Sequence, residues 1–183
     1  MNKLNGLRDA LLAASVLALP AAYAATMTKA DYAAGKTRIS ADYKTDTAAC
    51  ASQAGNAKDI CMQEAKAKER VALAELEYGY TGKAADHNKV AVVKAESAYA
   101  VAKERCDDQS GNAKDVCVKE AKAVETKALA DAKMGKEIGE AKKDAAADKL
   151  DADYKVAIEK CDALAGDAKS NCVAAAKTKF GKN

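Results

Sequence analysis

The sequence contains few of the residues that build a large globular core. Its 183 residues include no tryptophan and a single phenylalanine, Phe180. Hydrophobic stabilisation grows with the apolar area removed from water, at roughly 25 cal/mol per Å². A chain this poor in large apolar side chains therefore gains little from packing alone, and a thick hydrophobic core is not expected.

Proline is also nearly absent, and this absence favours helices. The only proline is Pro20, so nothing of that kind interrupts a helix later in the chain. Alanine, lysine and glutamate, all strong helix formers, are abundant. No stretch shows the alternation of β-branched and polar residues that is typical of a strand. These features predict an all-α fold.

Residues 1–24 have the organisation of a secretory signal peptide. Lys3 and Arg8 give a basic start, residues 11–19 form an apolar run, and Ala22-Tyr23-Ala24 is a small-x-small cleavage motif. No later apolar run is long enough to cross a bilayer. We therefore expect a mature periplasmic chain with no integral membrane segment, in a compartment where disulfides persist.

All six cysteines belong to three copies of one twelve-residue pattern. Each copy has a cysteine at both ends and, in its middle, a glycine followed by asparagine or aspartate. The cysteine pairs are Cys50 and Cys61, Cys106 and Cys117, and Cys161 and Cys172; the central residues are Gly55-Asn56, Gly111-Asn112 and Gly166-Asp167.

This spacing predicts a helical hairpin in each copy. Cysteines eleven positions apart in one continuous helix would lie about 16 Å apart, whereas a disulfide needs Cα atoms within about 4.4–6.8 Å. The glycine suits the left-handed position that ends a helix, and the following Asn or Asp suits the cap of the next. We predict three disulfide-stapled antiparallel helical hairpins, in an extended helical bundle or a coiled-coil-like array.

Other uses of the cysteines are disfavoured by their spacing. Six cysteines allow fifteen pairings, but the repeat favours pairing within each copy. Zinc sites place two to four residues between paired cysteines, whereas ten intervene here, and the only histidine, His87, lies in no copy. There is also no Cys-x-x-Cys redox pair. We expect no metal site, no cofactor and no catalytic residues, and hence no enzyme.

The copies recur about every 55 residues, which is in the range of helical repeats. We divide the mature chain into hairpin repeats at 25–80, 81–136 and 137–183. Tyr78-Gly79-Tyr80-Thr81-Gly82 is expected to end one helix before another begins near 83–86. Gly135 and Gly139 leave two possibilities, a break or only a kink. The sequence also leaves open whether the hairpins stack or form an extended array.

The charge pattern argues against nucleic acid as a partner. Lysine and arginine number 30 against 27 acidic residues, a net charge of +3. Proteins that bind phosphate backbones usually concentrate positive charge on one face. Near-balanced charges at helical spacing instead indicate a solvated surface with many ion pairs.

The stapled pattern at Cys50–Cys61 and runs such as Glu120-Ala121-Lys122-Ala123 resemble a group of secreted, Ala/Lys-rich helical proteins of β-proteobacteria, often labelled TolA-like cell-envelope proteins. TolA itself is similar only in its long periplasmic helix, so its function is not carried over. The resemblance implies a cell-envelope protein with unidentified protein partners. We expect a non-catalytic structural or interaction element. The alternative is a small periplasmic chaperone that binds unfolded clients, which requires an exposed apolar concave face.

Overall fold

The computed structural model describes residues 27–182, so the expected signal peptide, residues 1–24, lies outside the described residues. The described chain contains five α-helices, two short 3-10 turns and no strand, which confirms the all-α prediction. The elements are α1 (Lys29–Ala49), η1 (Cys50–Ser52), α2 (Gly55–Thr81), α3 (Ala84–Arg105), η2 (Cys106–Asp108), α4 (Gly111–Asp162) and α5 (Gly166–Phe180).

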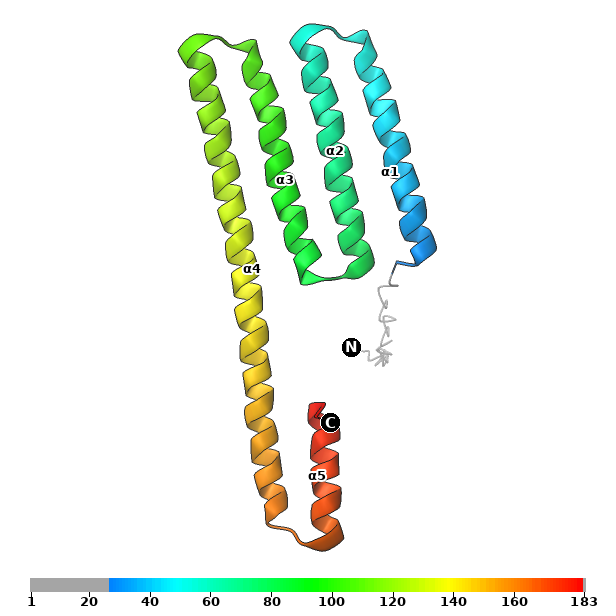
Figure 1. Ribbon diagram of the computed structural model, residues 1–183, viewed down its shortest axis with the longest axis vertical. Helices are drawn as coiled ribbons and strands as arrows, with labels where there is room; N and C mark the ends of the chain where they lie inside the picture. The colour runs from blue at the N-terminus through cyan, green and yellow to red at the C-terminus, as the bar shows by residue number, and fades with distance from the viewer. Residues whose placement is uncertain (1–26, 183) are drawn as a thin grey trace, which may run out of the picture.

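The helices form a single antiparallel layer (Figure 1). α1, α2, α3 and the first half of α4 lie side by side, and substantial contacts join helices that follow one another in sequence. α5 packs against the far end of α4. The first two hairpins therefore stack, whereas the third projects beyond them along α4.

This layer encloses very little core, as the sequence suggested. The buried apolar residues are three cysteines and five alanines: Cys50, Cys106, Cys161, Ala65, Ala74, Ala95, Ala132 and Ala176. Alanine lets helix axes approach closely but buries little area. Contacts along narrow seams, together with the disulfides, hold the helices in place.

Side-chain contacts join α1 to α2 at the end of the first hairpin opposite its turn. Tyr32 on α1 stacks on Tyr80 of α2, with ring centroids 4.6 Å apart. The Tyr32 hydroxyl donates a hydrogen bond to the Glu77 carboxylate, which raises the pKa of Tyr32 above its usual value. Gly35 lets α1 approach α2 closely, since a Cβ there would lie 2.7 Å from Cδ1 of Leu76.

The helix boundaries follow local chain chemistry. α1 begins with a capping box, in which the Thr28 side chain accepts a hydrogen bond from the Asp31 backbone N–H and Asp31 caps Thr28 in return. α2 ends at Gly82, which has a φ of 61° and donates its N–H to the Tyr78 carbonyl at 2.8 Å. The expected break at 78–82 therefore occurs, and α3 begins at Ala84.

The boundary placed between residues 136 and 137 does not separate two helices. α4 runs unbroken through it for 52 residues, so the second and third repeats share one helix. Gly135 and Gly139 do not break the helix. The surrounding residues supply i,i+4 ion pairs, Lys133–Glu137 and Lys136–Glu140, each at 3.8 Å, and such pairs support an exposed helix.

Candidate functional site

The three disulfides join the cysteines within each repeat. The Cα–Cα distances are 5.6 Å for Cys50–Cys61, 5.7 Å for Cys106–Cys117 and 5.6 Å for Cys161–Cys172. The first cysteine of each pair is almost completely buried, and the described residues contain no free cysteine. The predicted pairing is confirmed, and each bridge ties the two helices of its hairpin together directly beside the turn.

The central glycines have the left-handed backbone that the turn requires. Gly55, Gly111 and Gly166 all have a φ of 56°. A residue with a side chain would be strained at this angle. The predicted left-handed conformation is therefore present in all three copies, but each glycine begins the second helix of its hairpin and does not end the first.

The predicted capping role of Asn56, Asn112 and Asp167 is wrong. The helix N-cap is the residue before each glycine, namely Ala54, Ser110 or Ala165, in an extended conformation without a side-chain cap hydrogen bond. The Asn or Asp follows the glycine and so lies within the first helical turn. The physical reason is that the extended residue and the left-handed glycine redirect the backbone before the Asn or Asp is reached.

Asn56 instead connects two hairpins. Its Nδ2 donates a hydrogen bond of 2.7 Å to Oδ1 of Asp108, in the turn of the second hairpin. These two turns lie at the same end of the layer, whereas the third turn lies at the far end of α4 (Figure 1).

The described residues hold no arrangement typical of a metal centre. No group of three or more His, Cys, Asp or Glu side chains within 27–182 is placed to hold a metal ion. The ring of His87 packs edge-on against Tyr78, with centroids 4.9 Å apart. The surfaces between helices are therefore the better candidates for function.

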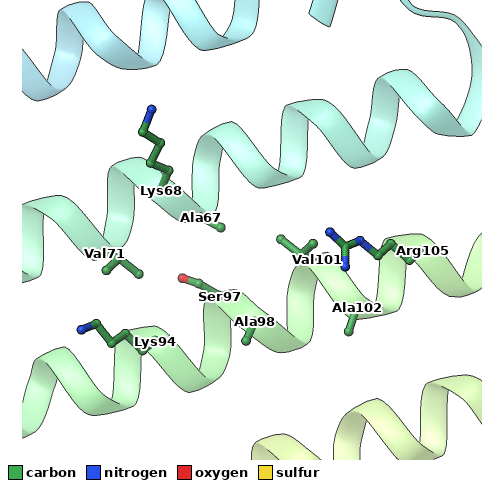
Figure 2. A pocket seen from close by; sticks show the side chains of 9 residues that line it. All are labelled: Ala67, Lys68, Val71, Lys94, Ser97, Ala98, Val101, Ala102 and Arg105. Atoms are coloured by element: carbon green, nitrogen blue, oxygen red, sulfur yellow. The ribbon is translucent and has the colours of Figure 1, made fainter.

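A first groove, of about 460 Å³, runs between α2 and α3 (Figure 2). Val71 and Val101 form apolar walls, and the charged residues that line it are all basic. Each basic group is paired with a carboxylate: Lys68 with Asp46 at 2.8 Å, Lys94 with Glu75 at 2.6 Å, and Arg105 with Glu64 at 2.5 Å. Because these charges are compensated, the groove has no strong preference for an anion.

Ser97 is the one polar residue buried in this groove. It is 3% exposed, and its hydroxyl has no hydrogen-bond partner. Figure 2 shows the hydroxyl pointing towards α2 beside Val71. Water cannot reach this atom either, so the hydroxyl is a cost to stability and is not accessible to a ligand.

A second and larger groove, of about 1000 Å³, lies between α3 and α4. Its walls are mostly small residues, among them Ala91 and Ala95 of α3 and Ala128 and Ala132 of α4. It extends along α4 as far as Lys143. The groove thus passes the beginning of α3 and opens onto a part of α4 with no neighbouring helix.

We call this part, residues 133–153, the unpaired stretch of α4. Every residue in it is exposed, whereas Ala132 before it and Cys161 after it are buried. Figure 1 shows why: α3 begins above the stretch and α5 ends below it. Sequence reasoning singled out the glycines here but did not predict that the stretch lacks a partner.

Within residues 27–182, no helix is both long and apolar enough to cross a membrane. Compared with known proteins, the chain matches no family model, no curated protein and no solved structure. Its function is therefore inferred from its own residues.

Proposed function

We propose that this protein is a non-catalytic periplasmic helical protein that acts as a structural or interaction element of the cell envelope. In this role α4 is a spacer, and its exposed surface contacts protein partners. The resemblance to secreted Ala/Lys-rich helical proteins supports the cell-envelope assignment.

The observation that carries this proposal is the continuity of α4. Its 52 residues correspond to a rod of about 78 Å, at about 1.5 Å per residue. The rod holds the third hairpin away from the stacked first and second hairpins (Figure 1). Such a shape is better suited to holding binding partners apart, or to contacting them along its surface, than to enclosing a substrate.

The three disulfides support an extracytoplasmic location. Bridges of this kind are typical of proteins that mature in an oxidising compartment. A seam of alanines contributes little hydrophobic stabilisation, so the hairpins depend on bridges that the cytosol would not maintain. The predicted signal at residues 1–24 is consistent with this compartment.

Fractionation of a Gram-negative host that expresses the tagged precursor tests the proposal. We expect the chain in the periplasmic fraction, with its first 24 residues removed. Alkylation should modify no thiols before reduction and all six cysteines after it. The matched control, Leu17→Arg, interrupts the apolar run of the signal and should retain the precursor in the cytosol. A wild-type chain that stays cytosolic with reactive thiols would contradict the proposal.

One observation favours a chaperone as the second candidate. Six large apolar residues of α4 are exposed, and five of them lie close together around the helix: Val116, Val124, Met134, Ile138 and Val156. At 3.6 residues per turn they fall within an arc of about 80°, an apolar flank that unfolded clients could contact. An aggregation assay with a model client tests this candidate. No suppression at equimolar protein rejects it, whereas suppression that Ile138→Gln weakens supports it.

A further inference from the structure

The first two hairpins are copies of one unit. Cys106 lies 56 positions after Cys50, and Cys117 lies 56 positions after Cys61. We call residues related by this offset counterparts, so that α3 is the counterpart of α1 and the first part of α4 is the counterpart of α2. The two hairpins are joined by packing of α2 against α3. The counterparts of these two packing surfaces lie on α4 and α1, the outer helices of the layer (Figure 1).

The counterpart surfaces are exposed within one chain. Ala74 and Ser97 are buried where α2 and α3 meet. Their counterparts, Ala130 on α4 and Ala41 on α1, are both exposed. α5 does not cover the surface on α4, because it lies on the same side of α4 as α3 (Figure 1). Each outer helix therefore presents one half of a contact that the molecule already makes between its own hairpins.

Both surfaces occupy one side of their helix, because their residues follow one another at helical spacing. The surface on α4, which we call the α4 edge, consists of Ala123, Lys127, Ala130, Asp131 and Met134. The surface on α1, which we call the α1 edge, consists of Ala34, Arg38, Ala41, Asp42 and Thr45. The lengths also match, since α1 has 21 residues and α3 has 22. α1 of a second copy can therefore cover the α4 edge as α3 covers α2.

The charges of the two edges are complementary at the position of an existing ion pair. Lys94 of α3 pairs with Glu75 of α2 at 2.6 Å. The counterparts are Arg38 on the α1 edge and Asp131 on the α4 edge, which keep the base and the acid in the same places. Within residues 27–182, neither Arg38 nor Asp131 takes part in an ion pair. A second copy would give each of them a partner.

A second position changes on both edges together. Val71 and Ala98 line the same groove between α2 and α3. Their counterparts are Lys127 on the α4 edge and Asp42 on the α1 edge. An apolar pair is thus replaced by two side chains of opposite charge, which attract each other if the two edges meet.

The remaining contacts between α2 and α3 are kept only in part. The hydrogen bond from Asn56 to Asp108 has Asn112 and Ser52 as counterparts, which keep a donor and an acceptor. The other two ion pairs between α2 and α3 are not preserved in the counterpart residues. A contact between copies should therefore be weaker than the contact within one chain, and reversible.

We propose that copies of this protein stack head-to-tail, with the α1 edge of one copy packed on the α4 edge of the next. Because the two surfaces differ, stacking continues into a filament or closes into a ring. The inference builds on the proposed interaction role by naming the partner of these surfaces. A chain that does not associate would leave the result of the export experiment unchanged, so the two proposals fail separately.

Sedimentation equilibrium of the oxidised mature chain tests the association. Ala130→Arg should raise the dissociation constant about tenfold or more, since the larger side chain blocks the approach of α1. Ala130 is exposed in one chain, so circular dichroism should show no loss of helix. Ala147→Arg changes an exposed alanine of the unpaired stretch and is the matched control, with an effect below about twofold. A wild-type chain that stays monomeric at about 100 µM would overturn the proposal.

Charge reversal tests the register. Asp131→Arg or Arg38→Asp alone should raise the dissociation constant about five- to tenfold, because like charges replace the ion pair. Both changes in one chain restore opposite charges and should return the constant to within about twofold of the wild type. Asp148→Arg, at an exposed aspartate outside the contact, is the control. Single variants without effect, or a double variant as weak as the single ones, would overturn the proposed pairing.

Mixing two blocked variants tests the head-to-tail arrangement. Ala41→Arg blocks the α1 edge and Ala130→Arg blocks the α4 edge, so each variant alone should be monomeric. An equimolar mixture still offers one intact edge of each kind and should form a 1:1 dimer and nothing larger. If either variant dimerises by itself, the contact joins two identical surfaces, and the head-to-tail arrangement is wrong.

Discussion

The Asn56 side chain donates a hydrogen bond of 2.7 Å to the carboxylate of Asp108, 52 positions further along the chain. This contact joins the turn of the first hairpin to the turn of the second. It adds to the ion pairs Lys94–Glu75 and Arg105–Glu64, which also join α2 to α3 and set the register of the two hairpins.

We predict that Asn56 and Asp108 are energetically coupled. A double-mutant cycle with Asn56→Ala and Asp108→Ala should give an interaction energy of about 0.5–1 kcal/mol, because the bond is exposed although its acceptor is charged. Chemical denaturation measures it. Asn112→Ala, at the equivalent position of the second turn, is the control and should show no coupling to Asp108. A coupling energy near zero for Asn56 would mean that the contact does not align the hairpins.

Ser97→Ala should make the protein more stable. The hydroxyl is buried and has no hydrogen-bond partner, so its removal should raise the free energy of unfolding by about 1 kcal/mol. The converse change, Ala95→Ser, places a hydroxyl at a buried position of the same helix and should lower this free energy. Destabilisation by Ser97→Ala would show that the hydroxyl has a partner after all. Urea denaturation of the three proteins gives the comparison.

The third disulfide should be the one on which its hairpin depends most. α5 has 15 residues, and within residues 27–182 its substantial contacts are with α4. Isolated helices of about 12–15 residues are marginal in water. A short loop such as this one gains about 2–3 kcal/mol from its bridge. Replacing Cys161 and Cys172 by serine should therefore remove hydrogen-exchange protection from α5.

The matched control is the double replacement of Cys50 and Cys61 by serine. α2 also packs against α3, so it should keep most of its protection without the first bridge. Equal loss of protection in the two variants would contradict this difference between the first and third hairpins.

The first turn of α1 should respond to acid. Hydrogen bonds from the Thr28 side chain, at 2.7 Å, and from its backbone N–H hold the pKa of the Asp31 carboxyl below its usual value of 3.8. A lowered carboxyl pKa stabilises the folded state above the unfolded pKa, and this contribution disappears as the pH falls through the folded pKa.

NMR titration of the Asp31 carboxyl measures this effect. The pKa should lie below 3.8 in the wild type and rise towards 3.8 in Thr28→Ala, with faster exchange of the first amides of α1. Thr37→Ala is the control, because Thr37 is in the same helix but bonds only the Ala33 carbonyl. An Asp31 pKa that Thr28→Ala leaves unchanged would show that the capping box does not form in solution.

The hairpins were predictable because their chemistry is local. The cysteines lie symmetrically about Gly55, Gly111 and Gly166, and only a reversal of the chain at the glycine brings them within bonding distance. The caps were predicted wrongly because a sequence shows that Asn56 suits a cap but not that Ala54 is already extended. Either Ala54 or Asn56 could cap the helix, and the backbone conformation of the turn places the cap at Ala54.

The arrangement of the hairpins was not predictable, for a different reason. A row of alanines on one helix can pack against many different helices equally well. Residues such as Ala65 and Ala95 therefore do not specify which helices pack together. Gly135 and Gly139 disfavour a helix locally, but the strong helix formers around them and the ion pairs Lys133–Glu137 and Lys136–Glu140 outweigh that cost. One signal of the unpaired stretch was present: α5 is 15 residues long, whereas α2, its equivalent in the first repeat, has 27.

Small-angle X-ray scattering of the oxidised mature chain tests the extended, single-layer architecture most directly. Because α4 alone is about 78 Å long, we predict a maximum dimension of at least about 80 Å. A globular domain of this length would instead have a radius of gyration of roughly 15 Å. A radius of gyration near 15 Å would mean that the third hairpin folds back onto the first two, and would contradict the role of α4 as a spacer.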